Sequence, residues 1–72
     1  MTLDEMVGNG ITIEGEIEIR ISDSKTYDTI VLFKDDAYEL DYDASYMYEE
    51  VSYMFAYNDV DSAVLCFELE EE

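Results

Sequence analysis

Hydrophobic and polar residues alternate along residues 11–22 of the chain. The odd-numbered positions hold the isoleucines Ile11, Ile13, Ile17, Ile19 and Ile21. The even-numbered positions hold charged or hydroxylated residues, which are Thr12, Glu14, Glu16, Glu18, Arg20 and Ser22. Successive side chains of a β-strand point to opposite faces, and β-branched residues favour that conformation. The pattern therefore predicts a half-buried strand over residues 11–22, with Gly15 at a bulge or bend.

A short helix is predicted ahead of this strand. Thr2 is suited to cap a helix that runs to Val7, and Glu5 stands where it completes a capping box. The segment 8–10, Gly-Asn-Gly, then ends the helix, because both residue types tolerate positive φ.

A second strand is predicted after the isoleucine strand. Residues 23–26, Asp-Ser-Lys-Thr, are typical of a turn, and residues 27–34 contain the next apolar run. The two strands are expected to pair as an antiparallel hairpin with a four-residue loop.

Two patterns compete between residues 43 and 57. The alternation typical of a strand is seen in Val51, Tyr53, Phe55 and Tyr57. The apolar stripe typical of a helix is seen in Met47, Tyr48, Val51, Met54 and Phe55. We favour a short helical or irregular segment at 41–48 and a strand over 50–57. A turn at 58–62 and a strand over 63–69 then complete a second hairpin. The alternative is a single helix over residues 43–57.

Together these elements predict an α+β fold, with a small antiparallel β-sheet of about four strands and one or two short helices. With 72 residues, no proline and three glycines, residues 1–72 are expected to form a single acidic domain. Cys66 is the only cysteine, and its apolar neighbours predict a buried thiol. The lack of paired cysteines is typical of a reducing cytoplasm.

The charge is strongly one-sided. Asp and Glu supply 20 residues and Lys and Arg only 3, which gives a net charge of −17 with no histidine. Small soluble domains usually carry a net charge of roughly 2–8 in magnitude. A chain this acidic repels nucleic acid and anionic membranes and attracts the proteins that bind them. We therefore expect a basic partner protein and no direct binding of nucleic acid or membrane.

Export signals are not expected in this sequence. No apolar stretch approaches the roughly 18 residues of a membrane span. Asp4 and Glu5 stand where a signal peptide carries basic residues. Both observations favour a cytoplasmic protein.

The residue types that carry catalysis are scarce, so no enzymatic activity and no cofactor are expected. Histidine, the commonest general base, is missing, and the chain contains no glycine-rich phosphate loop. Asp41, Asp43 and Ser45 match the first ligand positions of an EF-hand loop. Tyr46 then replaces the required glycine and Ser52 the bidentate glutamate, so we expect no dedicated metal site.

The predicted strand carries a first candidate binding surface. On one face of it, Glu14, Glu16 and Glu18 would lie about 6.6–6.8 Å apart, which is twice the rise per residue. That spacing is comparable to the spacing of phosphates along a nucleic-acid strand. The alternative is an ordinary polar outer face of an amphipathic sheet.

The middle of the chain carries a second candidate surface, in which carboxylates alternate with tyrosines. Its members are Asp35, Asp36, Glu39, Asp41, Asp43, Glu49 and Glu50, with Tyr38, Tyr42, Tyr46 and Tyr48. Tyrosine provides a large, stiff contact surface, and arginine stacks on its ring. The alternative is that about half of these tyrosines pack in the core.

In size, charge and lack of catalytic groups, the whole chain resembles the small acidic DNA-mimic proteins of phages and mobile elements. These include anti-CRISPR and anti-restriction inhibitors. The resemblance implies an inhibitor that occupies the DNA-binding, PAM-reading groove of a host nuclease, such as a CRISPR effector or a restriction enzyme. The resemblance also implies that the protein acts in the cytoplasm of the host cell.

Two other classes stay open. One is an acidic adaptor or assembly module that binds a basic tail or displays a sheet edge, as a homodimer for example. The other is a charge-rich domain whose acidity serves solubility at high salt, in which case salt stabilises the fold by screening self-repulsion.

Overall fold

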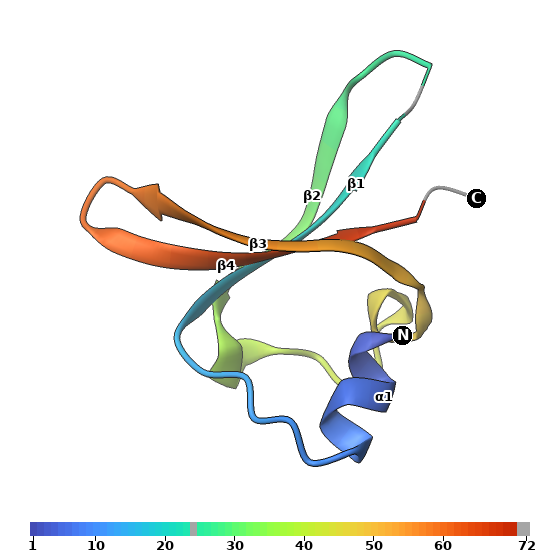
Figure 1. The fold of residues 1–72 in the computed structure, drawn as a ribbon, viewed down its shortest axis with the longest axis vertical. Coiled ribbons are helices and arrows are strands. Elements are labelled where there is room, and N and C mark those ends of the chain that lie inside the picture. Colours follow the sequence, from blue (N-terminus) through green and yellow to red (C-terminus); the bar gives the residue numbers. More distant parts are fainter. Residues whose placement is uncertain (24, 71–72) are drawn as a thin grey trace.

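The computed structural model of the chain describes residues 1–23 and 25–70. Within those residues, four strands form one sheet, and a helix and two 3₁₀ turns lie on one side of it (Figure 1). The elements in chain order are α1 (Leu3–Gly8), β1 (Glu16–Ser22), β2 (Thr29–Asp36), η1 (Ala37–Glu39), η2 (Ser45–Tyr48), β3 (Val51–Asp59) and β4 (Ser62–Leu69). The predicted α+β class is confirmed.

The sheet is mixed, and the prediction of an antiparallel sheet is wrong in this respect. β1 and β2 form one antiparallel hairpin and β3 and β4 another, but the order is β2-β1-β4-β3 and the central pair, β1 and β4, is parallel. The connection over residues 37–50 crosses from one edge of the sheet to the other. The strands that it joins, β2 and β3, run in the same direction, and a tight turn is too short to join two such strands.

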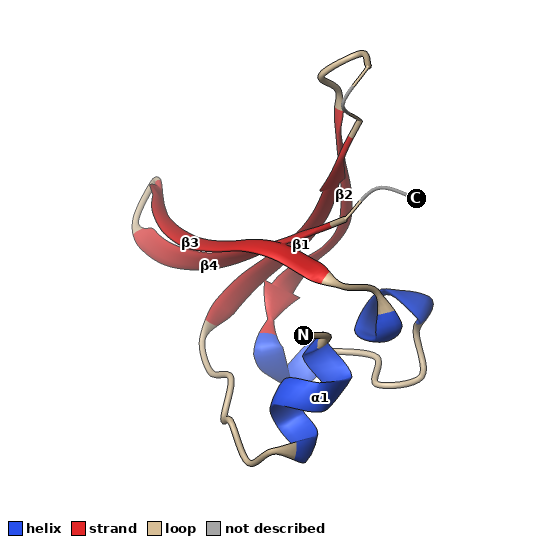
Figure 2. Cartoon of the chain, turned by 45° about the vertical axis from the view of Figure 1, so that its right-hand side comes forward, coloured by secondary structure: helices blue, strands red, loops and turns tan. Residues whose placement is uncertain are grey.

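The isoleucine strand is shorter than predicted. β1 begins at Glu16, because Gly15 has a φ of +87° that interrupts the extended backbone. Residues 11–14 instead form a loop between α1 and the sheet (Figure 2). Ile13 still packs against the core from this loop.

The first hairpin has a longer loop than predicted. β2 covers residues 29–36 rather than 27–34, and Tyr27 has a φ of +61° outside the strand. Backbone N–H groups of Asp23 and Tyr27 donate to the carbonyls of Asp28 and Asp23, both at 2.8 Å. Ser24 of the expected turn lies outside the described residues.

The helix and the second hairpin confirm their predictions. The N–H of Glu5 donates to Thr2 Oγ1 and the N–H of Thr2 to Glu5 Oε1, each at 3.1 Å, which is the predicted capping box. Residues 45–48 form the predicted short helical segment, and β3 replaces the alternative helix over 43–57.

Both faces of the central strands are buried. Beneath α1 and the crossover lies the main core: Leu3, Ile17, Ile19, Ala37, Leu40, Met47, Phe67 and Leu69. On the opposite face, Val64 and Cys66 have no exposed surface, which confirms the predicted burial of Cys66. The sheet curls over this second face, since Lys34 of β2 pairs with Asp59 of β3 at 2.7 Å, joining its two edge strands.

Candidate functional site

The predicted row of three exposed carboxylates on one strand is not present. Glu14 precedes β1, and the Glu18 residue is only 5% exposed. Glu18 Oε1 accepts a hydrogen bond of 2.9 Å from the Tyr57 hydroxyl. The Cys66 thiol donates to Oε2 at 3.5 Å. The prediction is wrong for Glu18 because β1 is a central strand whose second face is covered by the curled sheet.

The cations of the sheet lie on this same curled face, and each is paired with carboxylates. Arg20 Nη1 lies 3.5 Å from Glu18 Oε2, and Arg20 Nε lies 3.6 Å from Glu68 Oε2. The Arg20 guanidinium also lies 4.8 Å from the centre of the Phe55 ring. Lys34, described above, pairs with Asp59 on this face, so both basic residues of the sheet strands are engaged by carboxylates of the sheet.

Acidic residues and tyrosines are concentrated at the Gly15 end of the first hairpin and in the first part of the crossover that follows it. We call this region the acidic tyrosine surface, and its members are Glu14, Glu16, Asp35, Asp36, Tyr38, Glu39, Asp41, Tyr42 and Asp43. The N–H of Ala37 donates to the carbonyl of Gly15 at 2.8 Å, which holds the crossover against the loop before β1. Glu16 and Asp36 are register partners in adjacent strands, so two like charges face each other there.

A small pocket lies within this surface. It has a volume of about 260 Å³ and is lined by Thr12, Ile13, Glu14, Ala37, Tyr38 and Tyr42. Tyr38 is 92% exposed and Tyr42 is 52% exposed, so both phenol rings are available to a partner. Two aromatic rings beside one carboxylate provide stacking and an ion pair for a guanidinium group.

Backbone hydrogen bonds hold the acidic segment in shape. The N–H of Tyr38 donates to Asp36 Oδ1 at 3.0 Å and caps η1, and the N–H of Asp43 donates to Asp41 Oδ1 at 3.0 Å. Asp and Asn commonly shape turns in this way. These two hydrogen bonds fix the backbone of the acidic segment around its own carboxylates.

Besides Glu18, four residues of the sequence-based surfaces lie elsewhere, and one of them, Tyr48, is an exposed residue of η2. Tyr46 is partly buried, with its ring centre 6.0 Å from that of Phe33, and its hydroxyl accepts the N–H of Asp41 at 3.1 Å. It therefore supports the fold. Glu49 and Glu50 lie at the far end of the crossover, where Glu50 forms an ion pair with the N-terminal ammonium.

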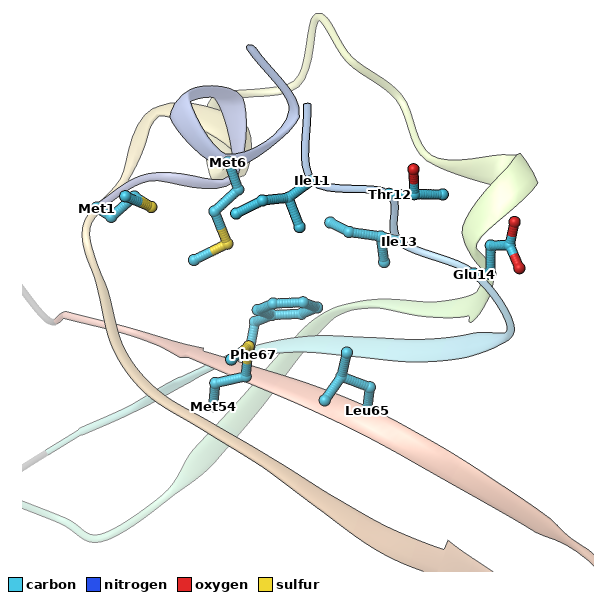
Figure 3. A pocket seen from close by; sticks show the side chains of 9 residues that line it. All are labelled: Met1, Met6, Ile11, Thr12, Ile13, Glu14, Met54, Leu65 and Phe67. Carbon is cyan, nitrogen blue, oxygen red and sulfur yellow. The ribbon is translucent and has the colours of Figure 1, made fainter. Parts of the chain in front are cut away.

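Sequence reasoning missed an apolar groove beside this surface (Figure 3). The segment over residues 11–14 forms its upper wall and β3 and β4 its floor. The signal was present in Ile11 and Ile13, which were attributed to a strand. Because Gly15 ends that strand early, their side chains are left to line a groove.

The geometry offers little reactive chemistry. Burial raises the pKa of the Cys66 thiol to about 11, so it remains protonated and a poor nucleophile. Among the residues that the structure describes, no group of three or more Cys, Asp or Glu side chains is arranged to hold a metal ion. Within the same residues, no helix has the length and apolar character needed to cross a membrane.

Comparisons of the chain with protein-family models, with curated proteins and with solved structures found no match.

Proposed function

We propose that this chain is a binding protein whose acidic tyrosine surface occupies a cationic groove that a partner protein uses for nucleic acid. The observation that supports this most directly is the pocket that joins Glu14 to the exposed rings of Tyr38 and Tyr42. Residues 35–43, which include Ala37, Tyr38 and Tyr42 of the pocket, contain five acidic residues and no basic one, so this segment carries a single sign of charge.

The surface presents the two kinds of group that a nucleic-acid groove recognises. Such grooves contact phosphates with Lys and Arg and stack bases on flat side chains. Carboxylates take the place of phosphates here, and the exposed phenol rings take the place of bases. Arginine suits both, because its guanidinium pairs with carboxylates and stacks on aromatic faces.

The free protein also bears a cost that a basic partner relieves. Glu16 and Asp36 face each other across two strands, and like charges in that position destabilise a sheet. A lysine or arginine of a partner placed between them turns repulsion into attraction. Complementary charge of this kind accelerates association and makes binding sensitive to salt.

We propose that the partner is a host defence nuclease that binds DNA, such as a CRISPR effector or a restriction enzyme. The two proteins would bind in the cytoplasm of the host cell. The chain acts by occupancy rather than by catalysis, since it has no histidine and its thiol is buried. Inhibition is then stoichiometric and is reversed by excess DNA.

The test compares two triple variants of equal charge. The first carries Glu14→Gln, Asp36→Asn and Asp41→Asn within the surface. The control carries Asp4→Asn, Asp61→Asn and Glu70→Gln, which are exposed acidic residues outside it. Each is titrated against a purified Cas9-type nuclease and a restriction enzyme, and the DNA bound is measured by fluorescence anisotropy.

We expect the unmodified chain to displace DNA, the control to match it, and the surface variant to lose the effect. Equal loss in both variants would show that net charge alone acts. No displacement from either enzyme would overturn the proposed partner class.

A second candidate function, an assembly module, is favoured by the free edge of β2. Ile30, Val31 and Leu32 are 57%, 51% and 42% exposed there, and an unpaired edge strand accepts a further strand. Sedimentation equilibrium separates the two candidates, since an assembly module self-associates and is indifferent to DNA.

A further inference from the structure

The apolar groove has two walls of different origin. Met6 from α1 and Ile11 and Ile13 from the following segment point down into it, and Met54, Leu65 and Phe67 from β3 and β4 face them from below (Figure 3). The groove has a volume of about 790 Å³, enough for several side chains. It is therefore larger than the tyrosine pocket, and seven of its nine lining residues are apolar.

Large apolar side chains in the groove remain exposed in the isolated chain. Met54 is 58% exposed and Ile11 is 48% exposed. Exposed apolar patches of this kind mark interaction sites in soluble proteins. Methionine is flexible and polarisable, and it adapts its shape to the partner side chain that it meets.

Carboxylates stand at both ends of this groove. Glu14 lines one end. At the other end, Met1 lines the groove, its ammonium forms an ion pair with Glu50, and the N–H of Glu70 donates to the carbonyl of Glu50 at 2.8 Å. An apolar groove between acidic ends is complementary to a segment that carries apolar side chains and flanking cations.

We propose that this groove binds a cationic amphipathic helix of a partner protein. A helix is favoured over a strand because the floor of the groove is formed by side chains on the face of β3 and β4, and the backbone groups of these strands hydrogen-bond within the plane of the sheet. A strand added there finds no hydrogen-bond partners, whereas a helix satisfies its own backbone.

The charges also argue against other occupants. A fatty acid would bring its carboxylate into an acidic rim. A second copy of the chain would bring a further charge of −17. This site is separate from the acidic tyrosine surface, although the segment over residues 11–14 borders both, and it stands whether or not that surface binds a nuclease.

The test uses a model peptide of leucine and lysine, about four helical turns long, with leucines at i, i+3, i+4 and i+7. Its control is a scrambled peptide of the same composition, which has the same charge without an apolar face. Binding to the full chain is followed by fluorescence anisotropy. We expect the patterned peptide to bind at least about tenfold more tightly than the scrambled one.

Substitutions assign the binding to the groove. Met54→Gln and Ile11→Thr change exposed side chains and should each weaken the patterned peptide several-fold. Ile30→Thr alters an equally exposed residue outside the groove and should leave binding unchanged. Circular dichroism checks that the variants fold, and methyl NMR of Met6 and Met54 should shift on addition of the patterned peptide alone.

Three outcomes would overturn the inference. Equal affinity for the two peptides would reduce it to charge attraction. Unchanged affinity in both groove variants, together with no shift of the methionine methyl signals, would place the peptide elsewhere. A dimer in light scattering that Met54→Gln converts to monomer would assign the groove to a second copy of this chain.

Discussion

The Tyr57 hydroxyl donates a 2.9 Å hydrogen bond to Glu18 Oε1, although β3 and β1 are separated in the sheet by β4. Cys66 lies on the strand between them and donates its thiol to the other oxygen of the same carboxylate at 3.5 Å. One buried carboxylate thus ties three strands together on the face away from α1. Glu18 belongs to the architecture of the sheet.

Replacement of this carboxylate should unfold the protein more readily. Glu18→Ala leaves the Tyr57 hydroxyl without its acceptor and removes one of the two carboxylates paired with Arg20, and we expect a loss of roughly 2–4 kcal/mol in the free energy of unfolding. Urea denaturation measures it. Glu18→Gln should lose less, since its amide oxygen still accepts from Tyr57, and equal losses in the two variants would contradict this account.

Reversal of the neighbouring charge should do the opposite. Glu16→Lys places a cation across from Asp36 in the register of β1 and β2. We expect a gain of about 0.5 kcal/mol at low salt, because the pair is screened by solvent. The gain should fade in high salt. The control, Asp28→Lys, makes the same charge change in the hairpin loop. A smaller gain in this control would show that the effect comes from the pairing with Asp36 and not from the lower net charge.

Alkaline pH should destabilise the fold. The Cys66 thiol has a pKa of about 11 in the folded protein, raised by burial from its ordinary 9.0. Between these values the unfolded chain loses the proton and the folded chain keeps it, so the free energy of unfolding falls as pH rises. The pKa of Lys34 is also raised, by its hydrogen bond to Asp59, and this contribution is lost as pH rises through the folded value.

Urea midpoints at about pH 8 and about pH 10 measure this loss. Cys66→Ala should start from a lower stability and fall less steeply over the same interval. An identical slope in the two proteins would show that the thiol does not contribute.

Acid pH should promote self-association of the chain through the exposed edge strand of the sheet. Near the sequence pI of about 4.1 the repulsion between chains disappears, and the exposed apolar residues of β2 remain. We expect light scattering to rise there. Val31→Lys should suppress the rise, whereas Asn9→Lys adds the same charge away from the edge and should not. Equal suppression by both would assign the effect to net charge.

The turn of the second hairpin is strained at Val60. Its φ of +48° lies in the left-handed region, which disfavours β-branched residues. Val60→Gly should therefore stabilise the protein by about 1 kcal/mol, and a side chain that is 95% exposed gives up little packing. A lower melting temperature in this variant would contradict the argument.

Local features of the chain were predictable because neighbouring residues decide them. The capping box of Thr2 and Glu5 depends on residues three apart, and each hairpin depends on a turn between two apolar runs. The tyrosines of the middle segment were harder to divide. Tyr38 and Tyr46 have the same chemistry and similar neighbours, yet one is exposed and the other packs on Phe33.

By itself the sequence determined that Ile17 and Glu18 point to opposite faces of a strand, since that follows from the geometry of one extended backbone. It did not determine what covers each face. Only the tertiary structure paired β1 in parallel with β4, curled the sheet over Glu18 and left Ile11 beside an open groove. These outcomes arise from contacts between residues 25, 39 and 48 positions apart, and no periodicity in a single segment encodes them.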